Sequence, residues 1–195
     1  MSWQESLRAH VRSLEHMMGR VDPDEVAVAL RLMDECRGLI IFAGIGQNLM
    51  LANKAASTYN SLSLRSISVD PVASLHGTMG MFRPDDLLVL LSKSGETAEL
   101  LRFVDACHRT GHTRILGVHS APGCELAGRS MHSVFIPLEA EADHLGLAPT
   151  ASSVCLLAFL HALAVELAGR RGLTAADFVR THPGGTIGSR LGAGA

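Results

Sequence analysis

Short apolar runs alternate with amphipathic stretches along most of this chain, and this alternation constrains the fold more than any other feature. The runs are apolar at successive positions, which is typical of strands buried on both faces. Amphipathic stretches such as residues 49–62 and 96–109 lie between most of them. We therefore predict an α/β fold in which helices sandwich a doubly wound, five-stranded parallel sheet, in a flavodoxin-like three-layer arrangement. The predicted strands are residues 39–43, 64–69, 87–91, 115–118 and 134–136.

Two helices are expected before the first strand, within residues 1–36. The first has an apolar face that consists of Leu7, Val11, Leu14 and Met18. The second follows Asp22-Pro23, a capping residue and then proline at the first helical position. Its apolar stripe consists of Val26, Leu30 and Met33.

A further helix is predicted at residues 149–168, and it is apolar almost all round. Such a helix must be buried on most of its sides. It could be the central core helix of a monomer. We favour a subunit interface as its cover, because one domain of this size cannot easily surround it.

Size and composition indicate one globular domain over residues 1–195, with the α/β core at 37–191. The chain is 47% hydrophobic and 18% charged. Its net charge of −2 argues against a protein built to coat nucleic acid or an acidic membrane. The N-terminus lacks the apolar region of a signal peptide, and the run at 154–160 is too short to span a bilayer. The four cysteines form no CxxC pair, so we expect reduced thiols in a cytoplasmic protein.

The motif with the clearest chemistry follows the third predicted strand and reads SKSGET. Gly95 permits a tight turn, and the helix that starts here presents unpaired N–H groups and the positive end of its dipole. Ser92, Ser94 and Thr97 add hydroxyl groups, and Lys93 can add a positive charge. The motif therefore predicts a binding site for an anion of phosphate size.

The glycine-containing loops allow two other interpretations. The SKSGET residues could be an ordinary helix cap with a capping-box glutamate, but hydroxyl groups on both sides of the glycine favour phosphate. The motif is not a Walker A sequence, and Gly44-Ile45-Gly46 lacks the third glycine of a dinucleotide fingerprint. We expect no nucleotide and no other cofactor.

The phosphate motif resembles the sugar-phosphate loop of SIS (sugar isomerase) domains, and three further stretches resemble arabinose-5-phosphate isomerases in particular. They are LGLAPT at 145–150 with Glu141 before it, the run from Arg170 to Phe178, and HPGG at 182–185. The resemblance covers roughly residues 37–191. Many such isomerases carry a pair of CBS modules after the SIS domain, and we expect this chain to be a single-domain form without them.

The resemblance implies aldose–ketose isomerisation of a phosphorylated sugar through an enediol intermediate, with D-arabinose 5-phosphate and D-ribulose 5-phosphate as the family pair. It also implies a homotetramer whose active sites are shared between subunits. Two alternatives remain: an enzyme similar to 6-phospho-3-hexuloisomerase, and a non-catalytic domain that senses a sugar phosphate.

Four acid–base residues match the family's active site. Glu141 is the favoured base at carbon, although alone it could be a solvated loop carboxylate. His182 is assigned to ring opening or proton shuttling, also in a neighbouring subunit, although a histidine before Pro-Gly-Gly is often only a turn residue. His76 is a second acid–base candidate. Glu99 is expected to orient sugar hydroxyls or the histidine, unless it is a plain exposed helix residue.

Several positions depart from the family's pattern. The family has a lysine where this chain has Gln47, directly after Gly46, and a small hydroxyl residue where it has Asn48. We expect Gly46, Gln47 and Asn48 to line the substrate site. Gln47 can donate hydrogen bonds but brings no charge, and Lys93 can partly replace the charge of the family's lysine. Ala73 and Thr78 replace a family glutamate and aspartate. The pattern indicates retained acid–base chemistry with altered sugar recognition, and no local ligand spacing indicates a metal.

Overall fold

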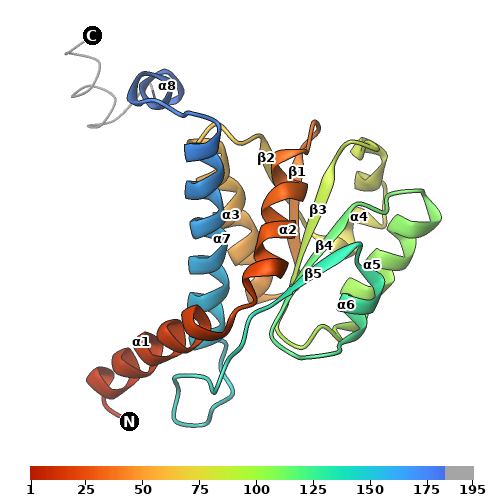
Figure 1. The fold of residues 1–195 in the computed structure, drawn as a ribbon. Coiled ribbons are helices and arrows are strands. Elements are labelled where there is room, and N and C mark those ends of the chain that lie inside the picture. Colours follow the sequence, from red (N-terminus) through yellow and green to blue (C-terminus); the bar gives the residue numbers. More distant parts are fainter. Residues whose placement is uncertain (183–195) are drawn as a thin grey trace.

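The computed structural model describes residues 1–182 and is built around a five-stranded, all-parallel sheet (Figure 1). The strand order is β2-β1-β3-β4-β5. The chain thus adds β2 on one side of β1 and then β3, β4 and β5 on the other side. The predicted α/β fold with a doubly wound parallel sheet is thereby confirmed. The strands are β1 (Ile40–Gly44), β2 (Ser66–Val69), β3 (Leu87–Ser92), β4 (Ile115–His119) and β5 (His132–Phe135).

Helices cover both faces of the sheet, and the bounds of the predicted elements differ from the prediction by at most two residues. One face packs against α2 (Pro23–Asp34) and α3 (Gln47–Ser61). The other face packs against α5 (Ala98–Arg109) and the short helices that the sequence pattern did not reveal. These short helices are α4 (Pro71–Ser74), η1 (Thr78–Met81) and α6 (Glu125–Arg129).

Alternating residues of the strands belong to two separate hydrophobic cores, one on each face of the sheet. Phe42 and Val89 belong to the core under α2 and α3, whereas Ile41 and Leu90 belong to the core under α5. All four side chains are fully buried. Because both faces of β1 and β3 are buried, apolar residues are needed at every position, and this explains the continuous apolar runs in the sequence.

The long helix α7 (Ala151–Arg170) packs against α3, α1 and α2. The buried Tyr59 hydroxyl on α3 donates a hydrogen bond to the Leu160 carbonyl of α7 at 3.1 Å. By length and composition alone α7 could cross a membrane, but 56% of its most apolar stretch is buried inside the protein. Val165, by contrast, is 66% exposed, so the chain covers α7 only in part.

Helix α1 (Trp3–Arg20) leads away from the sheet, at the lower left of Figure 1. The predicted apolar face is only partly covered: Leu14 packs against the core, but Leu7, Val11 and Met18 are exposed. The stripe on α2 is confirmed, since Leu30 and Met33 are buried and Val26 packs against the core. The difference arises because α1 touches the body mainly through α7, whereas α2 lies on the sheet.

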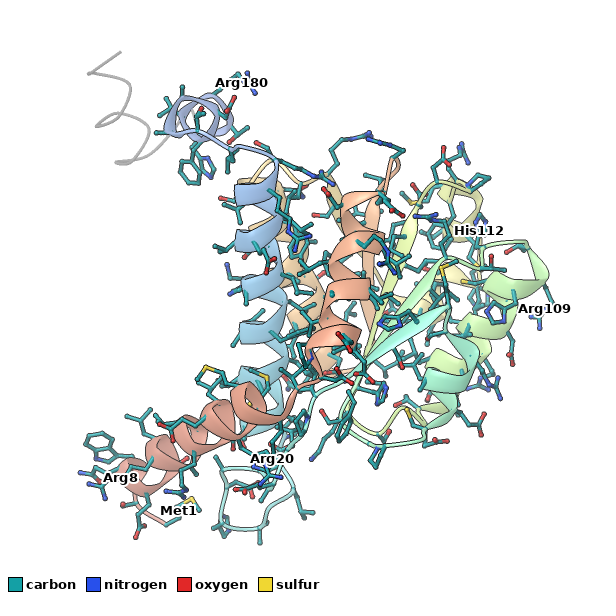
Figure 2. All side chains as sticks on the ribbon, in the orientation of Figure 1. Met1, Arg8, Arg20, Arg109, His112 and Arg180 are labelled. Carbon is teal, nitrogen blue, oxygen red and sulfur yellow. The ribbon has the colours of Figure 1, made fainter. Side chains whose placement is uncertain are left out.

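Parallel strands bring all their carboxyl ends to one edge of the sheet, so the segments that follow β1 to β5 meet there. The loop of residues 139–150 lies at this edge, at the bottom of Figure 1. Helix α8 (Ala175–Thr181) lies at the opposite end of the molecule. Figure 2 shows the same separation through two labelled residues, Arg20 near the loop and Arg180 on α8.

Candidate active site

The loop after β3 makes the tight turn that its sequence predicts. Gly95 adopts a φ of +67°, and its N–H donates a hydrogen bond to the Ser92 hydroxyl at 3.0 Å. A Cβ atom at position 95 would lie 2.6 Å from the Cβ of Cys124. Both the backbone conformation and the space therefore require glycine here.

Neighbouring segments hold the loop in place. The Ser120 N–H donates to the Lys93 carbonyl at 3.0 Å, and the Leu126 N–H donates to the Gly95 carbonyl at 3.0 Å. The side chain of Glu96 accepts a hydrogen bond from the backbone of α6, at 2.7 Å. This glutamate is thus tied to the loop's neighbour and does not reach back to cap its own helix.

The three hydroxyl groups of the motif have different surroundings. Ser92 is buried, and its oxygen lies 3.4 Å from the Thr97 hydroxyl, so these two gather as predicted. Ser94 is exposed, and its hydroxyl accepts the Glu96 N–H at 3.2 Å. No side chain caps the start of α5 among the described residues. Its first N–H groups therefore form a place where an anion can bind.

Glu141 lies at the same edge of the sheet and is held by five hydrogen bonds. Its side chain is 1% exposed. One carboxylate oxygen accepts from the Lys93 ammonium at 2.5 Å and from the Ser152 hydroxyl at 2.6 Å. The other accepts from the Thr150 N–H at 2.9 Å, the Ser152 N–H at 3.0 Å and the Thr150 hydroxyl at 3.3 Å. The predicted phosphate loop and the predicted catalytic glutamate are thus in direct contact.

These contacts keep Glu141 ionised. Burial alone would raise the pKa of this carboxyl group, but the hydrogen bonds from Lys93, Ser152 and Thr150 outweigh burial and lower the pKa to about 2. A carboxylate with such a pKa is a weak base, and both of its oxygens are occupied. The role of Glu141 as the base at carbon stays a prediction, and it requires that one of these donors move away.

The starts of α5 and α7 both lie at this edge of the sheet, and they differ in whether an anion already accepts their N–H groups. The start of α7 already has an anion, the carboxylate of Glu141, which accepts two of its N–H groups. The start of α5 has no such partner within residues 1–182. A helix start stabilises a negative charge through its dipole and free N–H groups, so we expect an external anion at the start of α5.

The remaining predicted residues of this edge lie on three neighbouring segments. Gly46, with a φ of +60°, precedes α3, and Gln47 and Asn48 are the first two residues of that helix. His76 is exposed and lies between α4 and η1. Glu99 lies half-buried in the first turn of α5. The segment that contains His76 follows α4, which packs against α5.

The two other departures from the family pattern belong to the same region. Ala73 lies on α4, and Thr78 begins η1, and both are exposed. Polar groups expected from the family are thus absent from the segment that follows β2. The roles of these positions in sugar recognition stay predictions.

His182 is not brought to this site within one chain. It follows α8, which lies at the end of the molecule opposite to the loop of residues 139–150 (Figure 1). Its Nε2 atom lies 2.8 Å from the Ser61 hydroxyl, at the end of α3, and its Nδ1 atom lies 2.8 Å from the Phe178 carbonyl. Its ring stacks on Phe178 with 3.9 Å between centroids. Pro183, Gly184 and Gly185 of the HPGG motif lie outside the described residues.

Two residues at the end of β4 were missed by the sequence reasoning. His119 is 3% exposed and pairs in register with Ser92 of β3. Its Nδ1 atom donates to the Ala121 carbonyl at 2.9 Å, while its Nε2 atom and the Ser120 hydroxyl are buried without a partner in the described part of the chain. Burial lowers the pKa of His119, so the ring stays neutral near pH 7. The rule that ligands bind at strand ends applies to β4 as well, and could have found them.

Comparisons with known proteins identify the class of the domain. The family model of the SIS domain matches residues 32–166, and the chain belongs to the SIS domain family. An Escherichia coli CFT073 protein solved in complex with arabinose 5-phosphate superposes with a TM-score of 0.88 at 32% identity. That similarity covers 92% of this chain and 95% of the other.

Relatives of this chain include proteins named arabinose 5-phosphate isomerase. It is 34% identical to KdsD of Escherichia coli (strain K12) over 164 residues, which is 84% of this chain and 50% of KdsD. It is 31% identical to KpsF of Escherichia coli over 190 residues, which is 97% of this chain and 58% of KpsF. The chain thus spans about half the length of the curated relatives that it matches.

Within residues 1–182, no group of three or more histidine, cysteine, aspartate or glutamate side chains is arranged to hold a metal ion.

Proposed function

We propose that this protein is an aldose–ketose isomerase that acts on a phosphorylated sugar. One observation carries the proposal: the uncapped start of α5, which can bind a phosphate, lies beside the ion pair of Lys93 and the buried Glu141. Binding a phosphate needs only the first feature. A buried ionised carboxylate beside that site is the arrangement needed for acid–base work on the attached sugar.

The reaction moves one proton between neighbouring carbons. A base removes a proton from C1 of the ketose while the C2 oxygen is protonated, which gives the enediol. A proton then returns to C2 and the O1 proton leaves, which gives the aldose. We assign the carbon steps to Glu141, once one of its hydrogen-bond donors has moved away, and the oxygen steps to His76, with Glu99 orienting the sugar hydroxyls or the histidine.

The pair D-arabinose 5-phosphate and D-ribulose 5-phosphate is the first substrate pair to test. The relatives named arabinose 5-phosphate isomerase and the relative solved with arabinose 5-phosphate support this choice. Gln47, at the start of α3, argues for altered recognition, because it brings no charge where the family has a lysine. A ketose 6-phosphate with one more carbon is therefore the second substrate to test.

We also propose that the working form is an oligomer, and a homotetramer in particular. His182 follows α8, at the end of the molecule opposite to the loop of residues 139–150, and this supports its assignment to the site of another copy. The exposed apolar residues Leu7, Val11 and Met18 of α1 would be covered in such an assembly. An apolar hollow of about 400 Å³ between α1 and α7 adds to this surface, and its lining includes Leu14, Met17 and Phe159.

The test is isomerisation in heavy water. We expect purified protein to convert D-ribulose 5-phosphate to an aldose 5-phosphate with deuterium at C2, as measured by NMR and mass spectrometry. The panel should include D-arabinose 5-phosphate, a hexulose 6-phosphate and the same sugars without phosphate. The unphosphorylated sugars should not react, because the proposal depends on the phosphate site.

The absence of both product and deuterium exchange across this panel would refute the isomerase. If the protein still bound a sugar phosphate in that case, the sensor interpretation would replace it. Size-exclusion chromatography with light scattering tests the assembly, and a monomer at micromolar concentration would contradict the shared site.

A further inference from the structure

The edge of the sheet that is proposed to bind phosphate is rich in negative charge. Five segments follow the strands there: residues 45–48, 70–77, 93–99, 120–124 and 136–152. Together they contain six carboxylates and a single lysine or arginine, which is Lys93. Since like charges repel, a phosphate dianion at this edge depends on that one cation.

The geometry of Lys93 leaves it able to meet such an anion. Its side chain is 47% exposed, whereas its partner Glu141 is 1% exposed. Its ammonium group has three N–H donors, and the described residues give it one acceptor, Glu141 at 2.5 Å. Two donors thus have no acceptor among the described residues. Lys93 also belongs to the loop that leads into the uncapped start of α5.

Glu141 is suited to hold this ammonium group in place. Four of its five hydrogen bonds come from Thr150 and Ser152, at the start of α7, so its position does not depend on Lys93. A fixed carboxylate restricts the long lysine side chain before a ligand arrives, which reduces the entropy that binding must overcome.

We infer that Lys93 is the phosphate-binding cation of this site, and that the buried Glu141 is the counter-ion that holds it beside the start of α5. This inference deepens the proposed function and shares with it the expectation of a phosphorylated ligand. It also accounts for Gln47: because the charge is supplied from the loop after β3, the position after Gly46 need not carry one.

The chain offers a direct test, because it contains two lysines only, Lys54 and Lys93. Lys54 lies on α3 and donates to the Thr58 hydroxyl at an exposed position. In protein labelled with ¹⁵N at the lysine side chains, we expect inorganic phosphate to shift the Lys93 ammonium signal and to leave that of Lys54 in place. In Glu141→Gln protein without phosphate, the Lys93 signal should already differ from wild type, because its partner is gone.

Binding measurements give the second readout. Lys93→Met should lower the affinity for inorganic phosphate and for D-ribulose 5-phosphate by about tenfold. This is the lower end of what a hydrogen bond to a charged group contributes. Lys93→Arg should recover most of the loss because it keeps the charge, and the matched variant Lys54→Met should bind as wild type does. Thermal unfolding of each variant shows that the fold is retained.

The outcomes separate this inference from the isomerase proposal. If no sugar phosphate is isomerised but phosphate shifts Lys93 alone, the isomerase proposal fails and the assignment of Lys93 stands. The assignment would be overturned, even in an active enzyme, if saturating phosphate did not shift the Lys93 signal. It would also be overturned if Lys93→Met protein bound phosphate with unchanged affinity. A signal that responds to the sugar phosphate but not to inorganic phosphate would also overturn it.

Discussion

Replacement of Glu141 by glutamine tests the central feature of the site through the stability of the fold. The substitution keeps the shape of the side chain and removes its charge, which five hydrogen bonds from Lys93, Thr150 and Ser152 now stabilise. These bonds outweigh burial and lower the pKa from 4.5 to about 2. Because one pKa unit corresponds to about 1.4 kcal/mol, we expect the loss of this charge to cost about 3 kcal/mol of unfolding free energy at pH 7.

The pH dependence of this cost has a definite sign. The folded pKa of Glu141 lies below its unfolded value, so the unfolded chain binds the proton more readily in acid. The stabilisation is therefore complete above about pH 4.5 and is lost as the pH falls toward 2. The difference between wild type and Glu141→Gln should shrink over the same range.

The assay is urea unfolding of both proteins at pH 7, 4.5 and 3, at one fixed protein concentration because assembly affects apparent stability. Glu139→Gln is the matched control two residues away. Glu139 pairs with His16 at 3.0 Å but is 62% exposed, so its loss should cost less than about 1 kcal/mol. A cost at position 141 as small as that of the control, or one that does not change with pH, would refute the reasoning.

Three further predictions concern the frame around the site. Gly95→Ala should lower the unfolding free energy by about 2 kcal/mol or more and abolish phosphate binding, because the φ of Gly95 is +67° and a Cβ atom there would clash with Cys124. Gly111→Ala is the control: its φ is +83° but the space around it is open, so this variant should cost only about 1 kcal/mol. Tyr59→Phe should cost about 1 kcal/mol in urea unfolding, because a buried carbonyl of α7 loses its donor. Burial lowers the pKa of His119, so the unfolded chain binds its proton more readily and stability should fall as the pH drops below about 6.5; His119→Gln should flatten this slope in unfolding curves from pH 7.5 to 5, and an unchanged slope would contradict the burial argument.

The sequence alone was enough to predict the layered fold and one half of the site. Continuous apolar runs are required wherever a strand is buried on both faces, so β1 and β3 could be recognised without coordinates. The turn at Gly95 and the helix start after it are local features within a few residues, and local backbone chemistry determines them. A strand followed by such a turn predicts an anion site before any tertiary contact is known.

The other half of the site depends on contacts between distant segments, which no local pattern encodes. Lys93 and Glu141 are 48 positions apart in the chain, and only the sheet order places the ends of β3 and β5 near enough for their contact. His182, by contrast, lies against Ser61 at the end of α3, a position that the HPGG motif by itself could not show. Local sequence determines strands, turns and helix starts because these need only neighbouring atoms, whereas the charge state of Glu141 depends on donors that only the packed chain brings together.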